Sequence, residues 1–231
     1  MKYKVLLPLL VSGVFFNACS KEDDKMNTPG DKILETYYPG STMEINELAI
    51  YTSNGVISDP AVIQDFLDRN VSTETKNYFY VNQSSVNINA NNTVLYFLEK
   101  NRVHINGTNM EIVAQKDSLM IVSEYTSTPV PENNSTCSAL AGKVPEFSSY
   151  YDCPDGSCAS YRRTYPIIKS GINYYIPMLT YASVTKDCAM APIEIPAINI
   201  KNHSLQSKLV EGDSVLIQYA KLPLVKKTVS N

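Results

Sequence analysis

The chain is poor in the side chains that many catalytic sites require. Its 231 residues include two histidines and no tryptophan. His104 lies beside Asn106-Gly107 and His203 lies in a polar stretch, and no His-x3-His or His-Glu pairing occurs. The sequence therefore does not predict a zinc hydrolase with a paired-histidine motif, and we interpret both histidines as surface residues. The absence of Trp also removes a side chain that glycan-binding platforms often use.

Clusters of positive charge are equally scarce. The longest Lys/Arg runs are Arg162-Arg163 and Lys226-Lys227. Without residues 1–18, the chain keeps 18 basic residues (20 minus Lys2 and Lys4) against 23 acidic ones, a net charge of −5. Nucleic-acid binding requires a basic face, so we exclude nucleic acid as the partner.

One apolar run stands out, from Val5 to Phe16 behind Lys2 and Lys4. It is shorter than the roughly 20 residues of a membrane-spanning helix and matches the core of a secretion signal. Small Ala18 directly precedes Cys19, after which the sequence becomes polar. We therefore predict a cleaved signal peptide over residues 1–18.

The segment around Cys19 resembles a bacterial lipobox, in which a peptidase cuts before a cysteine that carries diacylglycerol. Lys21-Glu22-Asp23-Asp24 resembles the acidic export signal of surface lipoproteins in Bacteroidota-type bacteria. The resemblance implies lipidation of Cys19, a flexible tether over residues 19–32, and attachment to the outer membrane on the cell surface. Two or three acyl chains would hold a protein firmly on a membrane, since each buried CH2 contributes about 0.8 kcal/mol to membrane binding. The alternative for the acidic residues is an ordinary solvated tether.

Four further cysteines follow, all in the second half of the chain. An even number in an exported protein predicts two disulfides. Of the three pairings, we favour Cys153–Cys158, which brackets the turn sequence Pro154-Asp155-Gly156-Ser157, with Cys137–Cys188. A zinc site is the alternative, but structural zinc prefers two to four residues between paired ligands. We predict no metal and no cofactor.

The residues from 33 to 231 predict a single all-β domain with one short helix. Tyr is frequent and Gly scarce, with 16 and 9 copies, and short apolar runs alternate with turn signals. Strands are expected over 43–51, 56–57, 78–81, 86–88, 93–99, 102–105, 109–114, 119–125, 147–151, 161–168, 172–184, 208–210 and 215–219. Residues 189–200 read as an extended crossing. The proline-rich segment 127–146 is expected to be a surface loop or, alternatively, a subdomain boundary.

The helix is predicted over 60–70. Asp59 is a suitable cap, Pro60 suits the first helical position, and Asn70 suits the end. Val62, Ile63, Phe66 and Leu67 recur at helical spacing and form one apolar face.

The predicted strands form an antiparallel meander, which favours a barrel or a two-sheet sandwich. Val94–Leu98 and Leu119–Val122 are apolar on both faces. Their second faces must pack against the helix, a second layer or a lined cavity. This arrangement resembles, loosely, the lipocalin-like barrels of lipoproteins in the same bacterial group, although the Gly-x-Trp signature is missing.

Motif searches identify no catalytic residue. Gly212-Asp213-Ser214 resembles a serine-hydrolase motif, but no histidine follows it, and a turn explains it fully. Asp117-Ser118-Leu119 and Asp213-Ser214-Val215 resemble the O-glycosylation sites of exported Bacteroidota-type proteins, so Ser118 and Ser214 are candidate sites. The carboxylate pairs Asp152/Asp155 and Asp65/Asp68 read as solvated charges. We therefore predict that the chain is not an enzyme.

A group of tyrosines is the remaining candidate site. Tyr150, Tyr151, Tyr161 and Tyr165 flank the Cys153–Cys158 turn, with Arg162 nearby. Exposed Tyr offers apolar area and a hydroxyl for a sugar or a protein partner. Cross-strand packing of these tyrosines in a sheet is the alternative, and it is the favoured one.

Three functions stay open. The first is a non-catalytic domain that binds a small molecule, glycan or protein, and a closed barrel with an apolar cavity would favour it. The second is a glycan-active enzyme, which a deep pocket with several carboxylates would favour. The third is an accessory subunit of an outer-membrane complex, which a large exposed apolar or Tyr-rich patch would favour.

Overall fold

The computed structural model describes residues 32–88, 94–105, 108–115, 118–122, 126–128, 140–147, 150–152, 159–161, 164–186 and 193–227. The predicted signal peptide, Cys19, Arg162 and the four remaining cysteines lie outside these residues. Signal cleavage, lipidation and both disulfides therefore stay predictions. No helix in the described part of the chain is long and apolar enough to cross a membrane.

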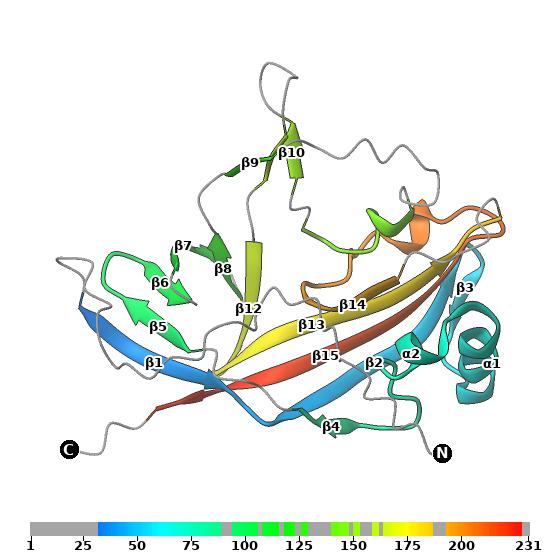
Figure 1. Ribbon diagram of the computed structural model, residues 1–231, viewed down its shortest axis with the longest axis horizontal. Coiled ribbons are helices and arrows are strands. Elements are labelled where there is room, and N and C mark those ends of the chain that lie inside the picture. The colour runs from blue at the N-terminus through cyan, green and yellow to red at the C-terminus, as the bar shows by residue number, and fades with distance from the viewer. Residues whose placement is uncertain are drawn as a thin grey trace, which may run out of the picture.

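The described residues form mainly antiparallel strands, which confirms the predicted fold class (Figure 1). The first strands are β1 (Ile33–Pro39), β2 (Thr42–Thr52), β3 (Gly55–Ile57), β4 (Ser85–Asn87), β5 (Leu95–Leu98), β6 (Arg102–Ile105), β7 (Thr108–Gln115) and β8 (Ser118–Val122). The later ones are β9 (Thr126–Thr128), β10 (Tyr150–Asp152), β11 (Ala159–Tyr161), β12 (Thr164–Ser170), β13 (Asn173–Val184), β14 (Ile193–Ile198) and β15 (Ser214–Lys226).

The strand pairings close into a ring at one end of the sheet. In the described residues the ring runs β1-β5-β6-β7-β8-β12-β13-β15 and returns to β1. β15 closes it because its length lets one edge pair first with β2 and then, at Leu224–Lys226, with β1. At the other end β2, β3 and β14 widen the sheet without closing it, so the whole is a curled half-barrel (Figure 1).

Alternation along β15 separates two faces of the sheet. Ala220, Leu222 and Leu224 point into the ring and pack with residues from the other strands, including Leu95 and Ile121. Val215 and Ile217 point to the outer face, where they pack in a second cluster. The ring interior is therefore a core filled by side chains.

Helix α1 (Pro60–Asn70) has the predicted bounds and cap. The Asp59 carboxylate accepts hydrogen bonds from the backbone N–H of Ala61 and Val62, at 2.8 and 3.1 Å. Ile63 and Leu67 are each 2% exposed and pack near Leu216, on the inner face beyond the ring. Val62, although part of the predicted apolar face, is 43% exposed. The buried face of α1 is therefore narrower than the predicted apolar face.

A short segment after α1 enters the end of the ring. The structure forms helix α2 (Thr73–Lys76), and the strand predicted over 78–81 does not occur. The reason lies in Gln218, whose buried side chain accepts from the Tyr80 N–H at 2.7 Å and donates to the Tyr78 carbonyl at 2.9 Å. These backbone groups thus bond to a side chain instead of to a neighbouring strand.

Two segments cover the outer face. Leu140 and Val144 from one segment, and Leu205 and Leu209 from the other, pack on β13 and β15. The strand predicted over 208–210 is wrong: residues Gln206–Lys208 form the 3-10 helix η1. Leu205 and Leu209, four positions apart, are both buried, because a helical turn brings residues at this spacing to the same side. The last part of the predicted 127–146 loop, with Leu140 and Val144, is therefore packed in the same apolar cluster as β13 and β15.

A small separate sheet is formed by β10, β11 and β9, in that order. Figure 1 draws it beyond the ends of β8 and β12.

Candidate ligand-binding groove

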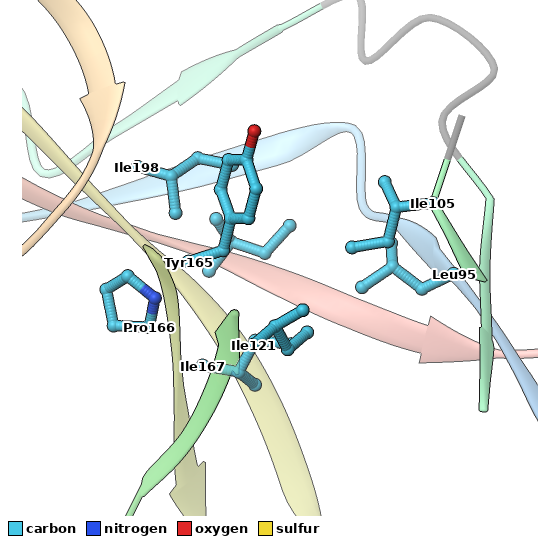
Figure 2. A pocket seen from close by; sticks show the side chains of 8 residues that line it. Leu95, Ile105, Ile121, Tyr165, Pro166, Ile167 and Ile198 are labelled. Carbon is cyan, nitrogen blue, oxygen red and sulfur yellow. The ribbon is translucent and has the colours of Figure 1, made fainter. Parts of the chain in front are cut away.

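The interior of the ring contains a cavity, but a small one. It measures about 30 Å³, which suits about two water molecules. Its lining is apolar and includes Leu95, Ile105, Ile121 and Ile198, whose side chains reach it from different walls (Figure 2). Ligand sites of proteins commonly have 300–1,000 Å³, so this cavity is a packing gap and not a ligand chamber.

A larger hollow lies at the mouth of the ring, which we call the mouth groove. Its volume is about 490 Å³, within the range of small-molecule sites. The lining comes from β1, the turn between β12 and β13, and the end of β15: Glu35, Tyr37, Lys169, Gly171, Ile172, Asn173, Tyr174, Leu224 and Lys226. Strand ends and a hairpin turn thus meet where the ring closes.

Aromatic rings form one wall of the groove. Tyr37 meets Phe97 edge-on with ring centroids 5.4 Å apart, and meets Tyr174 edge-on at 5.5 Å. Phe97 and Tyr174 stack at 6.1 Å. Tyr37 is buried. Tyr37 and Tyr174 line the groove, and Phe97 packs against both of them.

Charged groups lie directly beside this wall, because Lys226 pairs with Tyr37 in register and Glu35 lies two positions before Tyr37 on β1. Lys226 Nζ lies 2.5 Å from Glu35 Oε1, and the Tyr37 hydroxyl donates to Glu35 Oε2 at 2.8 Å. The hydrogen bond from Lys226, followed by that from Tyr37, lowers the pKa of Glu35 below its ordinary 4.5. Burial, and then the bond to Glu35, raises the pKa of Tyr37. At neutral pH Glu35 is therefore an anion already held by two partners.

The Glu35 carboxylate gives a pH-dependent prediction. Because folding lowers its pKa, its contribution to stability is complete above the ordinary 4.5 and is lost as pH falls through the folded value. Urea midpoints of wild type and Glu35→Gln should therefore differ at neutral pH and converge at low pH. Glu211→Gln, on an exposed turn, is the control. A Glu35→Gln difference that persists unchanged at low pH would refute this origin.

A second polar cluster lies on the outer face of the sheet. Lys201 Nζ lies 3.0 and 3.1 Å from the two oxygens of Glu47 and also donates to the Tyr51 hydroxyl, which donates to Glu47. Burial lowers the pKa of Lys201, but its bonds to Tyr51 and Glu47 outweigh this and raise it. Burial raises that of Tyr51. These contacts join Lys201 of the covering segment to Glu47 and Tyr51 of β2, so the cluster holds that segment in place.

The predicted tyrosine surface is divided by the fold. Tyr165 lies on β12 and lines the interior cavity (Figure 2), because its position faces Ile121 in register. The backbones of Tyr150, Tyr151 and Tyr161 belong to the separate small sheet, where Tyr150 pairs with Tyr161. Arg162 lies outside the described residues, so a binding role for this group stays a prediction.

The other predicted residues are scattered. Ser118 begins β8, and half-buried Ser214 begins β15 between Thr52 and Val184. His203 is exposed, and half-buried His104 lies with Nδ1 2.7 Å from Asn109 Oδ1. Asp65 and Asp68 form ion pairs with Arg69 and Lys76 on the helix surface. Glycosylation of the two serines stays a prediction. Within the described part of the chain, no three His, Cys, Asp or Glu residues gather as metal ligands.

Sequence reasoning did not identify the mouth groove. Ser170-Gly171 marked a turn, but nothing in the sequence indicated that this turn lies beside Glu35 and Lys226, which are 191 positions apart. The one sequence feature that pointed to this site is an apolar residue, Ile172, directly after the turn residues Ser170-Gly171.

Comparisons of the chain with protein-family models, with curated proteins and with solved structures found no significant match.

Proposed function

We propose that this chain is a non-catalytic, ligand-binding β domain and that its ligand lies in the mouth groove. The observation that carries the proposal is the groove of about 490 Å³ at the closed end of the half-barrel, whose lining combines aromatic rings with adjacent charged groups. The inner cavity, with only about 30 Å³, is too small for a ligand, so we expect the ligand at the mouth.

The groups in the groove favour binding over catalysis. Glycoside hydrolysis uses two carboxyl groups about 5–10 Å apart. The groove lining contains one, Glu35, which Lys226 and Tyr37 already engage. A glycan-active enzyme is thus the less supported alternative, and the accessory-subunit alternative lacks a specific observation in its favour.

We propose, in addition, that a lipid on Cys19 anchors the domain to the outer membrane, exposed on the cell surface. The support is the N-terminal sequence: an apolar run of signal length, Ala18-Cys19, and the acidic residues that follow. Protease shaving of intact cells tests this, with a periplasmic protein as control. Loss of this chain alone is expected; survival until lysis would place the domain inside the envelope.

Ligand binding is tested with a substitution that adds charge at the groove without touching the core. Ile172 is 91% exposed at the lip of the groove, so Ile172→Asp should leave stability unchanged within about 0.5 kcal/mol. Ligand-observed NMR of the full-length chain against soluble glycans and small molecules should yield ligands that Ile172→Asp no longer binds.

The matched control is Val210→Asp, because Val210 is 63% exposed on a turn and does not line the groove. Ligands must keep their affinity for this variant. If every ligand found binds Ile172→Asp as well as wild type, the site is not the mouth groove.

A further inference from the structure

The charges of the mouth groove do not cancel. Among the lining residues Glu35 is the one acid, and Lys226 neutralises it through an ion pair of 2.5 Å. Lys169 is the second lysine of the lining. Within the described residues it forms no ion pair. The lining therefore carries one ammonium group in excess.

The fold holds this ammonium group over an aromatic surface. Lys169 pairs in register with Tyr174 across the β12–β13 hairpin, and its Nζ lies 6.0 Å from the centre of the Tyr174 ring. Tyr174 is itself fixed by Tyr37 and Phe97. The Lys169 ammonium group and the Tyr174 ring thus lie next to each other in the lining of the groove.

Apolar and hydrogen-bonding groups frame this pair. Ile172 projects at the lip, 91% exposed, and Asn173 offers an exposed amide beside it. A ligand that matches the arrangement has a flat face for Tyr174 and Ile172, polar edges for Asn173, and an anionic group for Lys169.

We propose that the mouth groove binds a ring compound bearing a carboxylate, with the carboxylate on the Lys169 ammonium group and the ring against Tyr174. This inference rests on the proposed function, because it names the ligand class of the same site. An acidic sugar and an aromatic acid share this chemistry, and the experiment distinguishes them.

The test uses two pairs of probes, each matched except for the charge. The sugar pair is para-nitrophenyl β-glucuronide and para-nitrophenyl β-glucoside; the aromatic pair is phenylacetate and phenylacetamide. Affinities are measured by NMR titration of the full-length chain in a non-ionic detergent, in which these water-soluble probes stay in the aqueous phase. Release of nitrophenol from the sugar probes is followed at the same time, since it would reveal hydrolysis.

In at least one pair we expect the acid to bind about three- to ten-fold more tightly than its neutral partner, the range for one partly exposed charged contact. This preference should vanish in Lys169→Gln and shrink with added salt. It should persist in Lys208→Gln, which removes an exposed lysine that does not line the groove. The pair that shows the preference identifies the source.

The outcomes separate the two proposals. Equal affinity for acid and neutral probe, or a preference that survives in Lys169→Gln, overturns the carboxylate assignment. If those probes nevertheless lose affinity in Ile172→Asp, the groove remains the binding site. If no probe binds, the ligand class is wrong, and the groove is judged by the ligands of the wider screen. If the probes bind but Ile172→Asp changes nothing, the groove is wrong as well.

Discussion

Replacing Gln218 with leucine is expected to lower the free energy of unfolding by about 2–4 kcal/mol, because two backbone groups lose their partner. Gln218 is 1% exposed and lies on the inner face of β15. Its amide bonds to the carbonyl of Tyr78 and the N–H of Tyr80, at 2.9 and 2.7 Å. Leucine has a similar volume, so the loss comes from unpaired polar groups and not from a void.

Urea denaturation measures this loss, with Gln206→Leu as the control. Gln206 is exposed on η1, so the same change of side chain should cost less than about 0.5 kcal/mol there. Hydrogen exchange should also quicken at Tyr80, whose N–H loses its acceptor. A Gln218→Leu variant as stable as Gln206→Leu would mean that the amide does not hold the segment after α1 in the ring.

The second large effect is expected at Leu67. This side chain is 2% exposed and packs α1 onto the inner face of the sheet near Leu216. Leu67→Ala removes the contacts and leaves a void, which typically costs about 2–5 kcal/mol for a buried leucine. The midpoint of chemical denaturation should fall accordingly.

Val62→Ala is the matched control for Leu67→Ala, because Val62 lies on the same helix and is 43% exposed. We expect it to cost less than about 1 kcal/mol, since little apolar area is lost. Equal losses for the two variants would contradict the assignment of Leu67, together with Ile63, as the buried stripe of α1.

Local structure was predictable where short-range chemistry decides it. The cap of α1 is an example, because Asp59 needs nothing beyond the two N–H groups that follow it. β6 (Arg102–Ile105) has the predicted bounds, since alternating side chains and a turn sequence define such a strand locally. The strands predicted over 78–81 and 208–210 do not form, because contacts with distant residues decide the conformation of these segments. The first segment hydrogen-bonds to Gln218, and the second packs in the outer-face cluster.

The choice between barrel and sandwich depended on segments that the sequence did not reveal. The ring closes through β1 and the last residues of β15, neither of which was predicted as a strand. β15 contains Pro223 and ends at Lys226, a pattern that does not indicate a strand by itself. Its pairing with β1 supplies the stabilisation that local propensity lacks.

By itself, the sequence determined the all-β class, the position and cap of the helix, and the scarcity of histidine. These follow from composition and from contacts over a few positions, which are encoded locally. The tertiary structure decided the closure of the ring, the filling of its interior and the mouth groove. Glu35, Lys169, Tyr174 and Lys226 meet there only because strands from both ends of the chain pair side by side, and such long-range pairing leaves no signature in a single sequence.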